Sequence, residues 1–412
     1  MASRVTWAWG AAFVFSALAG FAAQAGPMEP PGTRVEVKPT GLPPVLQSQN
    51  AFNGPMKIER GPKDAPIVPK GFHVSLFSSG LDYPRWLAIS PNGDVFLAEP
   101  NAGEVRVLRD LDGDGKADLN RKFAEGFDRP HGLAFNGGNL YVGDLKAVWK
   151  VPYKEGDTQG GARSPVTRPG MIGTAGAHWT RDVAFAPDGK SFFVAIGSNG
   201  NIDEEPLPSA SVQQFTTDGS PMGTWASGLR NPVGIAFNPG TNDLYVTVNE
   251  RDTYGNNLVP DYLTKLDKKD YYGWPYAYIG PHPDPQFGSK SPGLVQRTKV
   301  PDLLFQAHSA PLGLVFYDKT AFPAEYRDGA FVALHGSWNR AEPTGYKVVY
   351  VPFKDGKPEG DYITFASGFW KSGDKQAQVW GRPAGLAVAA DGSLLIADDT
   401  ANVIWRVSYS GQ

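Results

Sequence analysis

The chain contains no cysteine among its 412 residues. It therefore cannot form disulfides, cysteine-ligated zinc sites, iron–sulfur clusters or the attachment site of a c-type haem. It also has no excess of positive charge, because 39 Lys and Arg stand against 42 Asp and Glu and give a net charge of −3. This balance argues against an electrostatic grip on nucleic acid, so we expect no nucleic-acid partner.

Long hydrophobic runs are also missing. The apolar stretch at residues 11–21 is shorter than the roughly 20 residues that a helix needs to span a bilayer. Arg4 precedes this stretch and Ala23-Gln24-Ala25 follows it, which is the pattern of a secretory signal with its cleavage site. We predict that residues 1–25 are a signal peptide cleaved near Ala25. The mature protein is then periplasmic or secreted and has no membrane span.

Apolar and turn-forming residues are plentiful. Hydrophobic residues make up 41% of the chain and aromatic residues 12%, which is enough to bury a sizeable core and excludes a disordered protein. Prolines are dense in residues 26–66, where little periodic pattern is found, and we interpret this segment as an extended leader. Residues 67–412 are expected to form the folded domain.

A phrase of a polar or proline corner, an alternating strand, a turn and a second strand recurs six times along this domain. The first three intervals are about 46 to 54 residues long, a period typical of propeller blades. The pattern predicts an all-β fold, a six-bladed β-propeller, with loop insertions near residues 253–305 and 365–380. A β-sandwich is the alternative, but it gives no reason for a repeated phrase. The repeats are marked by Pro84, Pro130, His178, Pro232, Pro311 and Pro383.

The two ends of the domain are expected to pair. Residues 71–77 alternate like a strand before the first full repeat, and residues 403–409 alternate at the end of the last one. We predict that the N-terminal strand joins the sheet of the last blade and closes the ring, which removes an exposed edge.

Cationic and polar side chains occupy the first positions of the repeats, which face the axis or its mouth in a propeller. Several cations meeting at one mouth would repel each other unless an anionic ligand lay between them. The alternative is that each arginine bridges neighbouring blades through a local acid. The set comprises Arg85, His131, His178, Arg181, Arg230, Asn231, His335, Asn339, Arg340 and Arg382.

Several motifs resemble those of the sorbosone dehydrogenase branch of the soluble quinoprotein sugar dehydrogenases, over roughly residues 68–410. The resemblance implies a six-bladed propeller that binds pyrroloquinoline quinone (PQQ) and calcium at its axis. It also implies oxidation of an aldose or related carbonyl sugar, with electrons passed to a separate acceptor. The motifs are His178-Trp-Thr-Arg181, Gly228-Leu-Arg-Asn231-Pro, Asn249-Glu-Arg-Asp252, Tyr272-Gly-Trp-Pro275, His308-Ser-Ala-Pro311 and His335-Gly-Ser-Trp-Asn-Arg340.

The same resemblance implies roles for individual residues. His178 matches the catalytic base, for which a neutral imidazole is suited, although a buried structural histidine is the alternative. Arg230 matches the group that polarises the reacting quinone oxygen. The matched or candidate cofactor contacts are Arg181, Asn231, Arg382 and either Arg340 or Asn339. The calcium ligands by position are the backbone carbonyls of Glu250 and Arg251.

A separate signal lies in the segment from Asp110 to Asp118. Its carboxylates Asp110, Asp112, Asp114 and Asp118 fall at positions 1, 3, 5 and 9 of a calcium loop, with glycine at position 6. Arg121 stands where the usual bidentate glutamate belongs, so another acid or water would have to complete the shell. We expect a structural calcium ion here, with a solvated hairpin loop as the alternative.

Two other functions compete with the dehydrogenase. A calcium-dependent sugar lactonase would need acidic side chains converging on an axial metal, whereas the repeat corners carry mainly arginine and histidine. A non-catalytic carbohydrate- or protein-binding propeller would have no need to bring His178, Arg230 and Arg382 together. Tryptophans such as Trp338 could stack on a sugar, but packing in the blade cores is the expected role.

Overall fold

Each repeated segment of the sequence forms one antiparallel β-sheet in the computed structural model, which describes residues 29–174 and 176–411. The all-β class is therefore confirmed. The predicted signal peptide at residues 1–25 lies outside the described residues. Among those residues, no helix is long and apolar enough to cross a membrane.

The first three sheets are formed by the first three repeats. The first contains β4 (Trp86–Ile89), β5 (Val95–Glu99), β6 (Glu104–Arg109) and β7 (Leu119–Glu125). The second contains β8 (Leu133–Asn136), β9 (Asn139–Gly143), β10 (Val148–Pro152) and β11 (Ser164–Pro165). The third contains β12 (Val183–Phe185), β13 (Ser191–Ile196), β14 (Ser211–Thr216) and β15 (Pro221–Ser227), with β19 (Asp270–Tyr271) parallel to β15.

The other three sheets follow the same plan. The fourth contains β16 (Asn231–Phe237), β17 (Leu244–Asn249), β18 (Tyr262–Leu266) and β22 (Leu303–Leu304). The fifth contains β23 (Pro311–Phe316), β24 (Ala330–Leu334), β25 (Lys347–Val351), β28 (Asp361–Ala366) and β1 (Arg34–Glu36). The sixth contains β31 (Pro383–Val388), β32 (Leu394–Asp398), β33 (Val403–Tyr409) and β3 (Phe72–Ser79).

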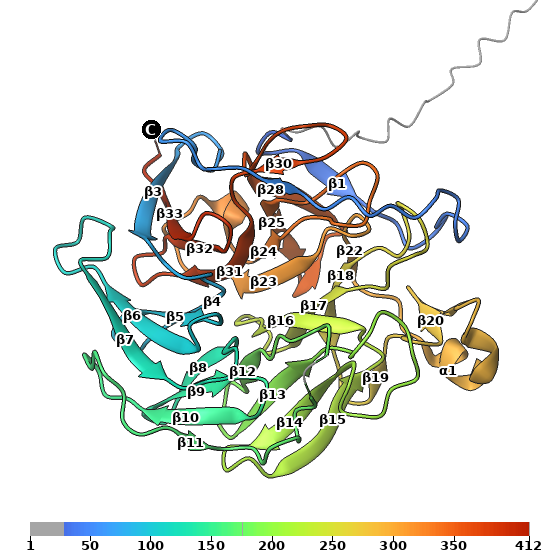
Figure 1. The fold of residues 1–412 in the computed structure, drawn as a ribbon, viewed down its shortest axis with the longest axis horizontal. Helices are drawn as coiled ribbons and strands as arrows, with labels where there is room; N and C mark the ends of the chain where they lie inside the picture. Colours follow the sequence, from blue (N-terminus) through green and yellow to red (C-terminus); the bar gives the residue numbers. More distant parts are fainter. Residues whose placement is uncertain (1–28, 175, 412) are drawn as a thin grey trace, which may run out of the picture.

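The six sheets are arranged around a common centre, and the first strand of each repeat lies nearest to it (Figure 1). Neighbouring first strands contact each other in chain order, and β31 also contacts β4. The loops that precede these strands therefore meet near the centre. Residues that are far apart in the sequence can combine there into one site.

Aromatic side chains fill the space between neighbouring sheets. Phe96 on β5 packs edge-on against Phe123 of its own sheet and Phe135 of the next, with ring centroids 4.8 and 4.9 Å apart. Phe96 is fully buried, and removing such a ring from water stabilises the fold by about 2–3 kcal/mol. Because neither face of a single sheet is covered by its own strands, each sheet depends on its neighbours for this burial.

The predicted pairing of the two ends is observed. Strand β3 pairs antiparallel with β33, from Phe72 opposite Tyr409 to Ser79 opposite Val403. The sixth sheet is thus built from both ends of the folded domain, as the alternating residues in the two segments indicated.

The expected insertions are located more narrowly by the structure. The segment 253–305 includes β18, which is a regular strand of the fourth sheet, so the added residues lie between β18 and β22. They contain β19, β20 (Ala277–Tyr278), β21 (His282–Pro283), the 3-10 helix η1 (Gly288–Lys290) and α1 (Pro292–Arg297). Figure 1 shows α1 and β20 projecting at one edge of the molecule. The remaining short elements are η2 (Ala324–Tyr326), β26 (Phe353–Lys354), β27 (Lys357–Pro358), β29 (Trp370–Ser372), β30 (Gln378–Val379) and β2 (Met56–Lys57).

The described part of the proline-rich segment, residues 29–66, lies against the sheets. Its strand β1 extends the fifth sheet by pairing with β28, and β2 pairs parallel with β30. Near its start, the Glu29 carboxylate is 2.5 Å from the Lys347 ammonium and also accepts a hydrogen bond from Thr364. The Lys347 side chain is only 3% exposed, so Glu29 neutralises a charge that would otherwise be buried alone.

This ion pair gives a test of what the segment contributes to stability. Glu29→Gln should lower the free energy of unfolding by about 3 kcal/mol, because it leaves the Lys347 ammonium buried without its carboxylate. Urea denaturation measures the loss. The matched control is Glu36→Gln, which removes an exposed carboxylate of the same segment and should change stability by less than about 1 kcal/mol. Equal stability of both variants would show that the Glu29–Lys347 pair is not a stabilising contact.

Candidate functional site

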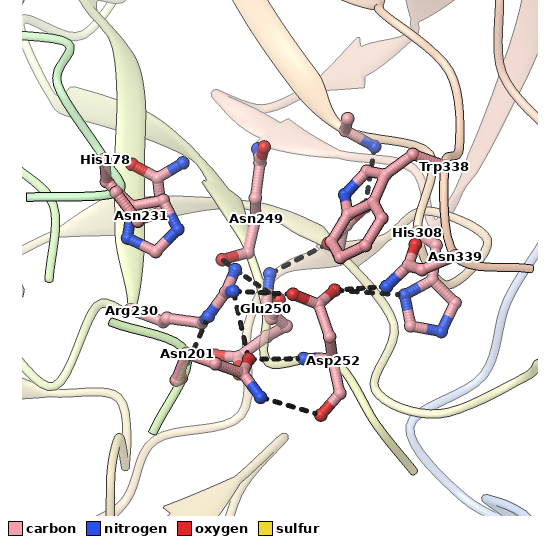
Figure 2. Close-up of a pocket in the computed structure, with 13 residues that line it drawn as sticks. His178, Asn201, Arg230, Asn231, Asn249, Glu250, Asp252, His308, Trp338 and Asn339 are labelled. Atoms are coloured by element: carbon pink, nitrogen blue, oxygen red, sulfur yellow. Dashed lines mark hydrogen bonds and ion pairs between the residues drawn. The ribbon is translucent and has the colours of Figure 1, made fainter. Parts of the chain in front are cut away.

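A cavity of about 380 Å³ opens beside the centre of the fold. The loops of the third, fourth and fifth sheets form it, because the residues before β12, β16 and β23 and after β17 and β24 meet there. In Figure 2, His178 lies on one side of the cavity and Trp338 on the other, with the Arg230 guanidinium between them. The lining residues are Ala177, His178, Asn201, Arg230, Asn231, Asn249, Glu250, Asp252, Asp261, His308, Ala310, Trp338 and Asn339.

The His178 ring is held in one tautomer. Its Nδ1 lies 2.8 Å from the carbonyl oxygen of Ser198, which can only accept, so Nδ1 carries the proton and donates it. Nε2 is then left with its lone pair. Burial lowers the pKa of His178 to about 4, and the nearby Arg230 cation acts in the same direction. At neutral pH the ring is therefore an unprotonated imidazole that can accept a proton at Nε2.

The Arg230 guanidinium is fully engaged by the protein. Its Nη2 is 2.7 Å from the Asp252 carboxylate, and the pair is largely buried, with side chains 6% and 13% exposed. Its Nη1 donates to the carbonyl oxygens of Asn249 and Glu250, while Nε and Nη2 donate to Asn201. Arg230 thus joins the loop before β16 to the loop after β13 and the loop after β17, and fixes their positions at the cavity.

Asp252 is the centre of the polar network on the other side. One carboxylate oxygen accepts a hydrogen bond from Asn339 at 2.5 Å and lies 3.6 Å from Nδ1 of His308. The other oxygen accepts from Arg230. Burial alone would raise the pKa of Asp252, but Arg230 and these hydrogen bonds hold it below its ordinary value. The residue is therefore an anion that balances the Arg230 charge.

Two further carboxyl groups lie deeper in the cavity wall. Burial raises the pKa of Glu250 to about 7 and that of Asp261 to about 6. Asp261 accepts backbone hydrogen bonds from Glu250 and Ala310. Glu250 Oε1, in contrast, is buried without a hydrogen-bond partner among the residues that the structure describes. This oxygen can therefore accept a hydrogen bond or coordinate a cation.

A second buried cluster lies where the first and last repeats meet. The Asp399 carboxylate is 2.5 Å from the Arg85 guanidinium and 2.9 Å from Nε2 of His335. Burial lowers the pKa of His335 to about 4, so the ring is neutral at pH 7, while Arg382 lies close enough to contribute to this shift. Burial opposes ionisation of Asp399, but His335, Arg85 and Arg382 hold its pKa below the ordinary value. The cluster has two guanidinium groups and one carboxylate, and so carries a net positive charge.

Arg382 belongs to this second cluster and does not line the cavity that contains His178. Its Nε and Nη2 donate to the carbonyl oxygens of His335 and Gly336. The same short segment continues to Trp338 and Asn339, which do line the cavity. The two sites are therefore linked through residues 335–339.

The other candidate cofactor contacts lie in different places. Asn231 lines the cavity, and its Oδ1 is buried without a partner among the described residues. Asn339 lines it as well, whereas Arg340 does not. Arg340 donates from Nη2 to Asn257 at 2.9 Å.

Arg181 is turned away from the cavity altogether. Its guanidinium donates to the carbonyl oxygens of Ile172, Thr174, His178 and Thr180, and the residue is 1% exposed. It stabilises the turn that carries His178. The geometry therefore gives Arg181 a positioning role and no contact with a ligand in the cavity.

The expectation that unpaired cations gather at one mouth is wrong for two of the arginines in that set, because Arg85 pairs with Asp399 and Arg230 with Asp252. The charge repulsion that suggested an anionic ligand is thus largely relieved within the protein. Within the cluster around Asp399, two guanidinium groups still share one carboxylate, and the Arg181 and Arg340 guanidinium groups are held by carbonyl and amide oxygens instead of acids.

Of the two residues whose backbone carbonyls are expected to hold an axial calcium ion, Glu250 lines the cavity and Arg251 does not. The Glu250 carbonyl oxygen accepts a hydrogen bond from Arg230 Nη1 at 2.7 Å, which occupies one of its two lone pairs. The carboxylates of Glu250, Asp252 and Asp261, which line the cavity, do not converge as a ligand set. In the described part of the chain, only Asp110, Asp112 and Asp118 bring three such ligand atoms within 4.8 Å of one another.

That acidic loop connects β6 and β7 at the outside of the first sheet. Asp110, Asp112 and Asp118 form the group just described, while Asp114 differs, because its carboxylate is 2.9 Å from the Lys116 ammonium. The Asp110 carboxylate also accepts the backbone N–H groups of Gly113 and Gly115, both at positive φ. The loop is thus folded around Asp110, and Asp114 is not part of the candidate ligand set.

Several cavity residues carried no role in the sequence analysis. Asn201 lies in a polar loop without a motif. Asp252 and His308 occur inside motifs that were noted, Asn249-Glu-Arg-Asp252 and His308-Ser-Ala-Pro311, but their side chains were not assigned. A carboxylate directly after a strand end is the signal that could have identified Asp252.

Comparisons with known proteins identify relatives for nearly the whole folded domain. The TrAA12-like family model matches residues 66–261 and 294–410. An uncharacterised protein of Borreliella burgdorferi is 29% identical over 83% of this chain and 90% of its own length. A pyrroloquinoline quinone-dependent pyranose dehydrogenase of Coprinopsis cinerea is 27% identical over 82% of this chain, and the match spans only 54% of that protein.

A solved structure supports the same assignment at the level of the fold. The calcium structure of a Trichoderma reesei carbohydrate-active enzyme of family AA12 superposes with a TM-score of 0.70 at 21% identity, covering 85% of this chain and 98% of the other. Because the family model matches well over half of the residues, the chain belongs to the TrAA12-like family and is a distant homologue of PQQ-dependent sugar dehydrogenases.

Proposed function

We propose that the protein oxidises an aldose or related sugar aldehyde with PQQ as the cofactor, as in the sorbosone-type enzymes that its motifs resemble. One observation carries the proposal: His178 lines the cavity as a neutral imidazole whose Nδ1 proton is held by Ser198, so that Nε2 is the accepting atom. A general base needs this arrangement, because its lone pair must face the substrate while the other nitrogen is anchored.

The residues at the two sites suit the cofactor and its cation. Calcium prefers oxygen ligands, and at the cavity Glu250 offers its unpartnered Oε1 and its backbone carbonyl, with the Arg251 carbonyl next along the chain. PQQ carries carboxylates, and the net positive cluster of Arg85, Arg382 and Asp399 suits such groups. Asn231 and Asn339 add amide groups at the cavity. Bound there, the quinone would supply a two-electron acceptor.

The chain's own residues supply the rest of the reaction. With a quinone bound as the acceptor of the anomeric hydride, Nε2 of His178 would take the proton from the hydroxyl on the anomeric carbon, and the aldose would become a lactone. Arg230, held by Asp252, would contribute positive charge beside the bound cofactor. Because the chain has no cysteine to attach a c-type haem, a separate electron acceptor is part of the proposal.

The fold in this proposal is a closed six-bladed propeller. The β3–β33 pairing and the contact between β31 and β4 support closure by the N-terminal strand. The acidic loop is proposed to hold a structural calcium ion through Asp110, Asp112 and Asp118. Export to the periplasm or outside the cell, with cleavage near Ala25, remains part of the proposal.

Cofactor reconstitution tests the proposed function directly. Purified protein mixed with PQQ and calcium should shift the absorption spectrum of the quinone and then reduce a dye when an aldose or sorbosone is added. Omitting calcium should abolish both effects, because the ion positions and polarises the quinone. Neither a spectral shift nor activity with any sugar of the panel would reject the dehydrogenase.

The role of His178 predicts both a mutational effect and a pH profile. His178→Gln should lower kcat by about 10²- to 10⁴-fold with quinone binding retained, since only the proton acceptor is removed. In the parent, the acid limb of kcat/KM that belongs to His178 should lie near its pKa of about 4, because protonation fills Nε2. It should be separate from any limbs of Glu250 and Asp261, whose pKa values are about 7 and about 6.

The control for this experiment is His73→Gln, which alters an exposed histidine on β3. It should leave kcat and the pH profile unchanged. A His178→Gln variant as active as the parent, or one that keeps the acid limb near a pH of about 4, would remove His178 from the role of base.

The calcium loop is tested by thermal unfolding. Calcium should raise the melting temperature of the parent by a few degrees, because an ion that binds only the folded state stabilises it. An Asp112→Asn, Asp118→Asn double variant should lose this part of the shift, whereas Asp114→Asn should keep it, since Asp114 pairs with Lys116. Any shift from an axial ion is common to all three proteins. Identical calcium responses would exclude an ion in the loop.

A further inference from the structure

An exposed pair of aromatic rings lies at the rim of the cavity. Trp338 lines the cavity and is 47% exposed, contrary to the packing role expected for it. Phe52, from the proline-rich segment, is 80% exposed, and its ring centroid lies 5.9 Å from that of Trp338 with the planes inclined by 40°. Among the exposed aromatic residues that the structure describes, Tyr409 instead pairs with Phe72, away from the cavity lining.

The backbone around Phe52 is fixed although its ring is exposed. The Asn53 N–H donates to the carbonyl oxygen of Trp338 at 2.7 Å. Its side-chain amide nitrogen lies 2.6 to 3.0 Å from the carbonyl oxygens of Arg340, Ala341 and Lys375. The segment therefore holds Phe52 beside Trp338 at a defined place, and the ring does not depend on its own burial to stay there.

The same segment also binds the loop after β17. Ser48 Oγ accepts the backbone N–H of Asn256, and Asn50 Oδ1 accepts that of Gly255. Gly255 in turn accepts a hydrogen bond from Nε2 of His308, which lines the cavity. Residues 48–53 thus connect the loop after β17 to the loop after β24, and Phe52 is part of this connecting segment.

We propose that Phe52 and Trp338 form a stacking subsite for a second pyranose ring, so that the preferred substrate is a reducing oligosaccharide. The reducing-end ring lies in the cavity, where its anomeric hydroxyl reaches His178, and the next ring leaves the cavity across the aromatic pair. This inference rests on the proposed function, since it extends the same site outward.

The chemistry of the pair fits a sugar. Aromatic rings present large apolar faces, and the axial C–H groups of a pyranose form a matching apolar face, while its hydroxyls stay in water or reach polar neighbours. The two rings, with centroids 5.9 Å apart and planes inclined by 40°, together offer an apolar surface for one pyranose. Two side chains are too few for a stable protein interface, which needs about 800 Å² on each partner. The pair's continuity with the cavity favours the substrate as its occupant.

Steady-state kinetics of the cofactor-loaded protein test the subsite. Glucose, cellobiose, cellotriose and maltose are the probes. In the parent, at least one disaccharide should have a lower KM than glucose. Phe52→Ala should raise the KM for that disaccharide roughly 3- to 10-fold, while the values for glucose and kcat remain unchanged, because only the second ring loses its stacking partner. Phe52→Trp should restore the low KM.

The matched control is Met222→Ala, which removes an exposed apolar side chain on β15. It should leave all four sugars unaffected. Because Phe52 is 80% exposed, its replacement is not expected to disturb folding, and an unchanged melting temperature verifies this. Equal effects of Phe52→Ala on glucose and on disaccharides, or no effect on either, would overturn the subsite.

A binding measurement separates this inference from the proposed function. Calorimetric titration of the full chain with cellobiose and maltose, without added cofactor, should show binding that Phe52→Ala weakens. If no sugar is oxidised but this binding is present, the dehydrogenase fails and the subsite stands. If sugars are oxidised but disaccharides bind no better than glucose, the dehydrogenase stands and the subsite fails.

Discussion

The site depends on the buried ion pair between Arg230 and Asp252. A guanidinium taken out of water is costly unless its charge and all its N–H groups are satisfied, and the structure meets both conditions with one carboxylate, an amide oxygen and three carbonyl oxygens. These partners come from different loops. The requirement to satisfy Arg230 therefore fixes the relative position of the loops and, with them, the cavity.

Asp252 extends this constraint to the fifth sheet. Its contacts with Asn339 and His308 tie the wall that carries Trp338 to the wall that carries Arg230. The proline-rich segment reinforces the same link from outside through Ser48, Asn50 and Asn53. The Arg230–Asp252 ion pair thus fixes the cavity from inside, and the hydrogen bonds of residues 48–53 fix it at its rim. Rigid placement of this kind is what the role proposed for His178, a proton acceptor, requires.

The elements of the fold were largely predictable, because each sheet has its own copy of a local pattern. The corner residues Pro84, Pro130, Pro232, Pro311 and Pro383 all fall just before or at the start of the first strand of a sheet. The alternation in residues 71–77 also indicated the pairing with β33, which burial of one face enforces.

The contacts between repeats were not predictable in the same way. Arg85 and Asp399 are 314 residues apart and meet only because the first and last sheets are neighbours. Arg181 occupies a corner like the other arginines, yet its partners are backbone carbonyls, which leave no trace in the sequence. Phe52 lies in a segment without periodicity, so its place at the cavity follows only from the hydrogen bonds of Asn53.

The complete pairing of Arg230 has a consequence for the order of folding and ligand binding. All five of its donors have partners supplied by the chain itself, so the interior around it reaches electrostatic neutrality without help from any small molecule. The loops around Arg230 can therefore reach their final positions before any ligand binds. If the protein binds a quinone as proposed, the affinity for it would not be reduced by the cost of ordering these loops.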